Sequence, residues 1–344
     1  MNEAHIILII GIVLVIFYDF TNGFHDAADM IATAIASHTI APGRAILLVT
    51  FFTLLGPLLG GVAVADTIGQ FVKINPHQTS VAQMVVISAL LSAIAYNLVT
   101  WKLGLPSSSS SSLTSGLVGA GLHAVGSQHI NWGIAELSHF QLAGFMKVVT
   151  GMFLSPLVGF IIGILIIKLF LKLFIRLTMK ARPLFIVSQY LSISWLAFSH
   201  GTNDAQKGMG MIAMMLFASG VTATFTVPFW VILLCATSIT CGTLFGGWSI
   251  IKTVGFGIYK VKLIHSLADQ IGSAGVILSS SLIGAPVSTT QVVTTTLVGI
   301  GTGEHPGHVK WKNVKHIFEG WLLNIPISIV IGYLINLLLS TFIH

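Results

Sequence analysis

Long apolar runs fill most of the chain, and short polar segments interrupt them at regular places. Runs of about 20 apolar residues suffice to cross a bilayer core of about 30 Å. Such runs occur at 45–65, 81–101, 141–175, 225–247, 263–283 and 317–341. Two further runs, 5–40 and 184–218, contain polar residues at 19–29 and 199–204, so we expect both to be broken helices. The pattern predicts an all-α polytopic membrane protein.

Two polar segments each occur twice, in the same order, in the two halves of the chain. The sequence FTNGFHDA at 20–27 returns as FSHGTNDA at 198–205, which is 178 residues later. The Ser-rich segment at 104–121 returns as a Ser/Thr segment at 284–301, which is 180 residues later. Two motifs repeated at nearly the same spacing indicate an internal duplication. We therefore divide the chain into a first repeat at 1–167, a basic cytoplasmic linker at 168–183 and a second repeat at 184–344.

The composition excludes several classes of protein. Apolar residues make up 54% of the chain and charged residues only 8%, which is typical of a membrane protein. No G-x-x-x-x-G-K-[ST] loop occurs, so the chain has no P-loop nucleotide site of its own. The formal charge of +6 is better explained by basic cytoplasmic loops than by a nucleic-acid partner.

The distribution of basic residues predicts the orientation in the membrane. If each Ser/Thr segment completes a crossing, each half has five crossings, and 13 of the 16 Lys and Arg residues fall on one side. The exceptions are Lys73, Lys147 and Lys207. The positive-inside rule makes the basic side cytoplasmic, which leaves both termini outside the cell membrane. An odd number of crossings in each half also makes the two halves inverted-topology repeats. If the Ser/Thr segments only dip into the membrane and return, the number of crossings becomes even.

The first duplicated motif carries the candidate cation ligands. Asp26 and Asp204 occupy equivalent positions, and an ionised carboxylate in hydrocarbon is costly unless it is paired or faces water. A structural ion pair would explain a single Asp better than a duplicated one. Inverted-repeat transporters place their sites near the midplane, where oxygen ligands suit a hard cation such as Na⁺. We predict that Na⁺ is held by carboxylate and amide oxygens of Asn22, Asp26, Asp29, Asn203 and Asp204.

The second duplicated motif suits an anion. In each copy a proline precedes a run of hydroxyl residues, which is typical of the first turn of a helix. The free N–H groups and the positive dipole end of a half-helix start form an anion site. A flexible linker is the alternative for six serines, but the apolar context and the second copy favour half-helices. We predict that phosphate lies among Ser108, Ser109, Ser110, Ser288, Thr289 and Thr290, with Asn203, Asp26 and Asp204 beside it.

For four charged residues the sequence is compatible with two different roles. Asp29 and Lys207 are equivalent positions of opposite charge, so either they pair with each other or Lys207 steers the anion. Asp269 and Glu319 have no counterpart in the first half. Each of these two is either a coupling-ion ligand or a member of a local ion pair.

The motifs resemble those of a known family. GFHDAAD at 23–29, GTND at 201–204 and PVSTT at 286–290 are similar to motifs of the PiT family of inorganic phosphate transporters, and the similarity covers both halves. The resemblance implies a cation-coupled phosphate symporter with an inverted-repeat fold that forms a homodimer. It also implies that Asp26 and Asp204 share a site with the Ser/Thr half-helices. Asp29 departs from the family pattern, which usually has Asn there, and the large central domain of animal members is absent.

The sequence therefore predicts a secondary transporter, not an enzyme, that imports inorganic phosphate with Na⁺ by alternating access. Within the same fold, the alternatives are sulfate as substrate or H⁺ coupling through His25 and His200, which are equally compatible with a structural role. An ion channel would need a pore ring, usually from several subunits. A hydrolase would need one activated nucleophile, and six serines without a G-x-S-x-G elbow single out none.

Overall fold

The computed structural model describes residues 3–69, 71, 79–137, 142–175, 181–246 and 248–342. Helices dominate these ranges, and no strand occurs in them. Five helices of the described part are long and apolar enough to cross a membrane: His5–Ala36, Pro42–Leu59, Thr79–Lys102, Gly144–Phe174 and Trp311–Thr341. The prediction of an all-α polytopic membrane protein is confirmed.

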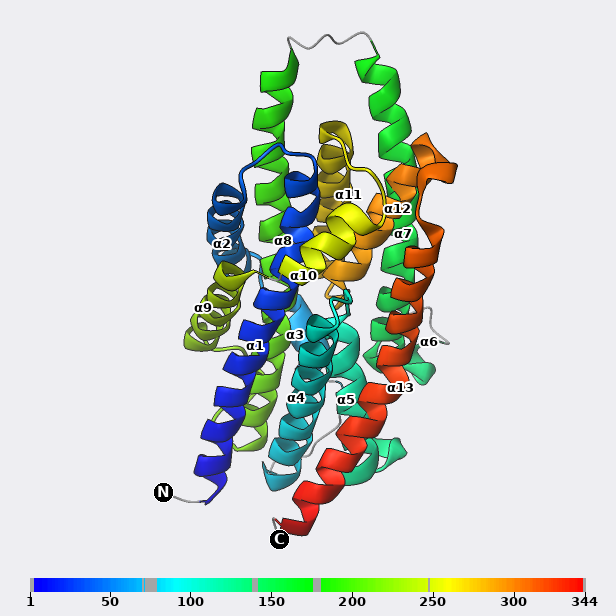
Figure 1. Cartoon of the computed structure of the whole chain (residues 1–344). Helices are drawn as coiled ribbons and strands as arrows, with labels where there is room; N and C mark the ends of the chain where they lie inside the picture. The colour runs from blue at the N-terminus through cyan, green and yellow to red at the C-terminus, as the bar shows by residue number, and fades with distance from the viewer. Residues whose placement is uncertain are drawn as a thin grey trace.

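The first half contains α1 (Glu3–Ala36), α2 (Pro42–Leu59), α3 (Ala63–Gly69), α4 (Thr79–Lys102), α5 (Ser109–Ala124), the 3₁₀ turn η1 (Ser127–His129), α6 (Ile134–Leu137) and α7 (Gly144–Phe174). In Figure 1, α1 rises from the N-terminus at the lower end, and α2 and α3 lead back down. The helices α4 and α5 form a hairpin that enters from the lower end and turns near the middle of the molecule. Helix α7 then rises to the upper end.

The second half contains α8 (Arg182–Ala218), α9 (Phe229–Phe245), α10 (Trp248–Ile251), the π-helix η3 (Lys252–Phe256), α11 (Leu263–Leu282), α12 (Thr289–Glu304), the 3₁₀ turn η4 (Pro306–His308) and α13 (Trp311–Phe342). The order of elements matches that of the first half. The hairpin of α11 and α12, however, enters from the upper end, and α13 ends beside the N-terminus at the lower end (Figure 1). Of the predicted linker, 168–174 continue α7, and 176–180 lie outside the described residues.

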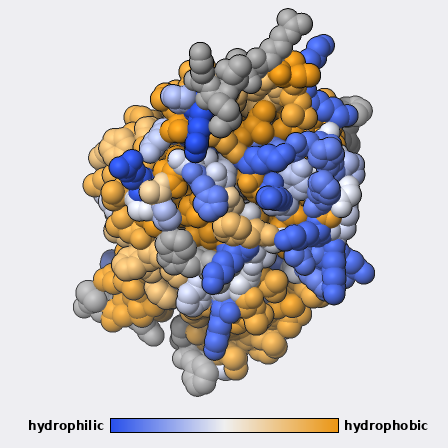
Figure 2. Space-filling view, turned by 45° about the horizontal axis from the view of Figure 1, so that its top comes forward, coloured by the Kyte–Doolittle hydropathy of each residue, from blue (hydrophilic) through white to orange (hydrophobic). Residues whose placement is uncertain are grey.

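The hairpins correct the predicted count of crossings. Each Ser/Thr helix dips in and returns together with the helix before it, so the expected five full crossings in each half are wrong. Each hairpin enters and leaves at one end and adds no crossing, whereas α1, α2 with α3, and α7 run between the two ends. The number of crossings in each half therefore stays odd, and the expectation that dipping segments make it even is wrong as well. Lys102, which the sequence assigned to the basic side, instead ends α4 at the hairpin turn. Figure 2, which tips the upper end forward, shows hydrophilic residues gathered there within an apolar surface.

Helices α1 and α8 are continuous, which corrects the prediction that they break at 19–29 and 199–204. The polar residues of the motif recur at spacings of three and four, so they form one stripe along an intact helix. The stripe is Asn22, His25, Asp26 and Asp29 on α1, and His200, Asn203, Asp204 and Lys207 on α8. Several of these side chains contact other helices, as Asn22 does with Asp204 and Asp26 with Thr289.

The glycine of each motif permits a close crossing of two helices. A Cβ added to Gly23 of α1 would lie 2.0 Å from the carbonyl oxygen of Ile239 on α9. A Cβ added to Gly201 of α8 would lie 2.3 Å from the carbonyl oxygen of Thr53 on α2. These glycines therefore serve helix packing.

The two halves interlock through equivalent contacts. Helix α5 packs against α13 and α12 packs against α7, so each hairpin lies on the last helix of the other half. In the same way α2 packs against α8, and α9 packs against α1. The polar stripes of α1 and α8 consequently lie where the two hairpins reach the interior.

Candidate functional site

Each hairpin turns at a glycine and then begins its second helix with a serine cap. Gly104 and Gly284 both have φ of +68°, in the left-handed region that glycine adopts readily. The side chains of Ser108 and Ser288 each accept a hydrogen bond from the backbone N–H three residues later, at 3.1 and 3.3 Å. The half-helix starts predicted at these serines are present, and the N–H groups before the first helical hydrogen bond are available to a ligand.

The starts of α5 and α12 meet inside the molecule. Ser110 Oγ donates to the carbonyl oxygen of Val287, at 2.6 Å, in the second hairpin turn. Tyr18 of α1 donates to the carbonyl oxygen of Ser109 at 3.3 Å, and Asn324 of α13 donates to that of Ser108 at 2.8 Å. The first helix start is thus held from two sides and faces the second.

The hydroxyls of the second helix start contact the carboxylates directly. Thr289 Oγ1 donates to Asp26 Oδ2 at 3.1 Å and lies 3.4 Å from Asp204 Oδ2. Thr290 Oγ1 donates to Asp29 Oδ2 at 2.6 Å and lies 3.2 Å from Asp26 Oδ1. The structure therefore brings three of the predicted cation ligands, Asp26, Asp29 and Asp204, and this part of the predicted anion site into one cluster.

Asp204 is surrounded by nitrogen atoms. Lys207 Nζ donates to Asp204 Oδ1 at 2.7 Å, and Asn22 Nδ2 donates to Asp204 Oδ2 at 3.1 Å. His200 Nδ1 lies 3.6 Å from the same Oδ2. Lys207 thus pairs with the carboxylate on its own helix and not with Asp29, which answers one of the alternatives left open by the sequence.

The two histidines differ in their surroundings. His25 Nδ1 lies 2.8 Å from Asp26 Oδ1, and its Nε2 lies 3.2 Å from Ser107 Oγ in the first hairpin turn. Ser107 also lies 2.8 Å from the hydroxyl of Thr100. Neither ring nitrogen of His200 has a hydrogen-bond partner among the described residues. His25 therefore links the α1 stripe to the first hairpin, whereas His200 has only its neighbouring carboxylate.

Asn203, predicted for both ligand sets, lies at the second hairpin turn. Its Nδ2 donates to Ser281 Oγ at 2.9 Å, and its Oδ1 accepts from the backbone N–H of Val287 at 3.4 Å. The side chain thus holds the turn that precedes Ser288. The structure does not place this amide among the carboxylates.

The remaining oxygen atoms fit a hard cation. Two groups of buried donors, one of His25, Asp26 and Asp29 and one of Asp26, His200 and Asp204, each have ligand atoms within 4.8 Å of one another. Asn22 Oδ1 and Asp29 Oδ1 are buried, and neither has a hydrogen-bond partner among the described residues. Buried polar atoms normally have partners, so these oxygens are available to coordinate an ion.

The sequence analysis did not assign Asp19 to the site, and it left the roles of Asp269 and Glu319 undecided. Asp19 is fully buried and belongs to the α1 stripe, since it lies three residues before Asn22. Asp269 on α11 is also fully buried, and no ion pair reaches it within the described part of the chain. Glu319 is exposed and forms a local ion pair with Lys315, whose Nζ lies 3.8 Å from its Oε1.

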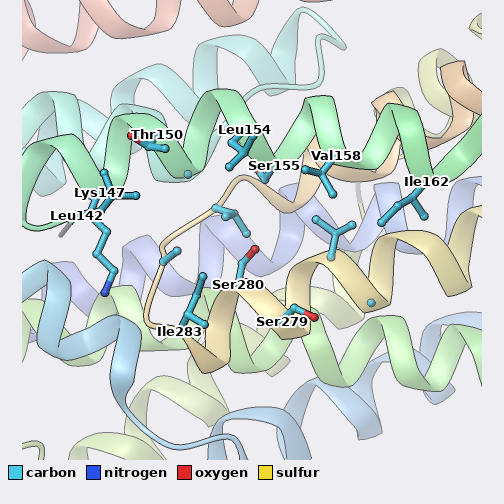
Figure 3. Close-up of a pocket in the computed structure, with 15 residues that line it drawn as sticks. Leu142, Lys147, Thr150, Leu154, Ser155, Val158, Ile162, Ser279, Ser280 and Ile283 are labelled. Carbon is cyan, nitrogen blue, oxygen red and sulfur yellow. The ribbon is translucent and has the colours of Figure 1, made fainter. Parts of the chain in front are cut away.

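Each hairpin turn is held by a threonine from the other half. Thr67 of α3 donates to the carbonyl oxygen of Gly284 at 2.7 Å, and Thr253 of η3 donates to that of Gly104 at 2.8 Å. A cavity of about 600 Å³ between α7 and α11 lies beside the second turn (Figure 3). Lys147 lines this cavity and donates to Thr67 at 3.2 Å. The second turn thus separates this cavity from the carboxylates.

Comparison with known proteins identifies the family. Residues 22–332 match the profile of the phosphate transporter family. The chain belongs to this family. Two proteins named as probable low-affinity inorganic phosphate transporters are similar over nearly their whole length. The one from Rhizobium meliloti (strain 1021) is 37% identical over 95% of each chain, and the one from Bacillus subtilis (strain 168) is 34% identical over 99% of each.

A solved structure described as the sodium-dependent phosphate transporter has the same fold. It matches with a TM-score of 0.84 and 24% identity, covering 98% of this chain and 100% of that one. The family resemblance expected from the motifs is therefore confirmed. The chain is a multi-pass phosphate transporter of the PiT family and not an enzyme.

Proposed function

We propose that this phosphate transporter is a Na⁺ symporter that imports inorganic phosphate across the cell membrane by alternating access. The observation that carries the proposal is the meeting of Asp26 and Asp204, one from each half, at the Thr289 hydroxyl. With Asp29, three carboxylates lie in one buried cluster, in which Lys207 supplies the only ammonium group among the described residues. Bound cations would balance the remaining charge, because unpaired buried charges are costly.

The same cluster explains why the anion would require the cation. The N–H groups at the starts of α5 and α12 form the proposed phosphate site. An arriving phosphate would meet the carboxylates contacted by Thr289 and Thr290. Bound Na⁺ would remove this repulsion, so each ligand would raise the affinity for the other.

The two hairpins supply a basis for alternating access. They enter from opposite ends, and the Thr67–Gly284 and Thr253–Gly104 contacts each hold one turn against an element of the other half. We infer that the halves are inverted repeats and that releasing one contact at a time opens the site to one side. The basic upper end would then be cytoplasmic and both termini external. The homodimer implied by the family motifs remains a prediction.

Uptake of labelled phosphate into proteoliposomes of the purified chain tests the proposal. The liposomes carry an inward Na⁺ gradient, an inward H⁺ gradient or no gradient, with excess unlabelled sulfate as competitor. Accumulation only with Na⁺, unaffected by sulfate, is the expected result. Accumulation with H⁺ alone would contradict Na⁺ coupling and favour His25 and His200 as proton carriers. Inhibition by sulfate would contradict the assignment of phosphate as the sole substrate.

A further inference from the structure

Lys207 occupies in the second half the position that Asp29 occupies in the first. On α1 the carboxylate of Asp26 is followed three residues later by a second carboxylate, whereas on α8 the carboxylate of Asp204 is followed three residues later by an ammonium group. Lys207 Nζ lies 2.7 Å from Asp204 Oδ1. No Lys or Arg of the described chain pairs with Asp29. At this position the first half carries a negative group and the second half a positive one, so the equivalent sites differ by two units of fixed charge.

The Lys207 ammonium group lies among buried carboxylates. Lys207 is the only Lys or Arg buried within the described ranges, and its side chain is fully buried. The fully or almost fully buried carboxylates of the same ranges are Asp19, Asp26, Asp29, Asp204 and Asp269. A buried ammonium group is retained only with partners of opposite charge, so Lys207 has a defined place in the charge balance of the site.

Asp19 is present on the side of the site that carries the lysine. It has no acidic counterpart in the second half, where Ala197 stands at the equivalent position. A Cβ added to Gly208, the residue after Lys207, would lie 2.3 Å from Asp19 Oδ2, so this carboxylate lies directly against the α8 backbone. The thiol of Cys235 on α9 is in hydrogen-bond contact with this carboxylate. Lys207 and Asp19, neither of which has a counterpart of the same charge in the other half, therefore lie on the same side of the site.

We propose that the Lys207 ammonium is a tethered cation that takes the place of one mobile coupling ion beside Asp204. The proposal rests on the Na⁺ coupling proposed above and specifies where the mobile ions bind. They bind at the Asp26 and Asp29 carboxylates, with which no Lys or Arg of the described ranges pairs. On the Asp204 side the same role falls to Nζ, which fills the space an ion would need. A neutral oxygen-bearing residue at position 207 would consequently open a further Na⁺ site.

The first test is the ratio of Na⁺ to phosphate carried into proteoliposomes, measured with both ions labelled. Lys207→Asn should carry about one more Na⁺ per phosphate than the natural chain, because one fixed charge is replaced by one mobile charge. Lys207→Arg keeps the charge and should keep the ratio. An active K207N variant with an unchanged ratio would overturn the proposal. If its phosphate affinity also fell, Lys207 would instead be a ligand of the anion.

The second test does not depend on transport. The unfolding temperature of the detergent-purified protein is measured against Na⁺ concentration, since the steepness of this dependence reports the ions bound by the folded state. K207N should show a steeper dependence than the natural chain, and K207R should not. Asp29→Lys places a tethered cation in the first half and should give a shallower dependence. Unchanged steepness in whichever of K207N and D29K folds would overturn the proposal.

The Na⁺ dependence of the unfolding temperature of the natural chain distinguishes failure of one proposal from failure of the other. If its unfolding temperature does not respond to Na⁺, the proposed Na⁺ coupling fails and the tethered-cation proposal fails with it. If the natural chain responds to Na⁺ and K207N responds equally, only the role of Lys207 fails.

Discussion

Thr289 on α12 donates its hydroxyl to Asp26 on α1 across 3.1 Å, although 263 residues separate the two in the chain. The contact joins the start of a hairpin helix to a carboxylate of the duplicated motif. Because that helix start is part of the proposed phosphate site, the proposed cation and anion sites share one element, the second hairpin. A displacement of this hairpin would alter both sites together, which is the physical requirement for coupling.

Neutralising either paired carboxylate should abolish coupled uptake without unfolding the protein. Asp26→Asn removes a charged ligand of the proposed Na⁺ site, and Asp204→Asn removes the carboxylate that pairs with the Lys207 ammonium; the loss of one charged contact costs roughly 1.5–3 kcal/mol, or about 10- to 100-fold in affinity. Na⁺-driven phosphate uptake is the measurement, with the surface substitution Glu319→Gln as a control that should transport normally. Near-normal uptake by both D26N and D204N would remove these residues from the site.

The Thr290 hydroxyl should be needed for the affinity of the first-half cation site. It donates to Asp29 at 2.6 Å, and Thr290→Val leaves this buried carboxylate without that donor at nearly unchanged volume. We expect the half-saturating Na⁺ concentration for uptake to change by about tenfold, since such a contact is worth roughly 1.5 kcal/mol. Thr290→Ser retains the hydroxyl and should behave as the natural chain. Identical Na⁺ dependence of T290V and T290S would contradict the assignment.

The motif glycine should be required for packing. Gly23→Ala places a methyl group 2.0 Å from the Ile239 carbonyl oxygen, so α1 and α9 must separate, and such overpacking costs about 1–3 kcal/mol. The unfolding temperature of the purified protein should fall. Gly275→Ala in α11 is the matched control, because no atom lies within 4 Å of its added Cβ and the helix should gain up to about 1 kcal/mol. Equal unfolding temperatures for G23A and G275A would refute the packing role.

The hairpin contacts should control which side of the site is open. Thr67→Val removes the hydrogen bond to Gly284, and Thr253→Val removes the one to Gly104. A net hydrogen bond of about 0.5–1.5 kcal/mol should shift the two populations by roughly 2- to 10-fold, in opposite directions. Thr67→Ser keeps the hydroxyl and serves as control.

Accessibility of a cysteine at the site reports this shift. Ser109→Cys is labelled from the external side with an impermeant maleimide, in a background where exposed Cys241 is replaced by Ser. T67V should increase external labelling, and T253V should decrease it. If both substitutions change labelling in the same direction, the hairpin turns are not opposing gates.

The sequence predicted the helices better than their passage through the membrane. Apolar runs located the long helices, and the Pro–Ser pattern located the starts of α5 and α12 because capping is a local property. The hairpins were missed because α4 is long and apolar enough to cross, and only packing against α5 and α13 keeps it as part of a hairpin. The expected breaks in α1 and α8 were wrong, although the three- and four-residue spacing of the polar residues indicated an intact helix.

The site was predicted in its residue types but not in its contacts. The duplicated carboxylates and hydroxyls were recognised because both copies carry them. That Thr289 contacts both Asp26 and Asp204 depends on how the second hairpin packs between the halves, and spacing along the chain carries no such information. Asp19 escaped notice because it lies outside the duplicated segment. Asn203 contacts the second hairpin turn, which its position next to Asp204 in the sequence did not indicate.

The most direct test of the account is the affinity of the purified protein for labelled phosphate, measured at equilibrium in Na⁺ and in an equal concentration of choline. Cations at the buried carboxylates should permit the anion to bind, so phosphate should bind at least about tenfold more tightly in Na⁺, and D26N should lose this difference. Equal phosphate affinity in Na⁺ and choline would contradict the claim that the carboxylate cluster couples the two ions.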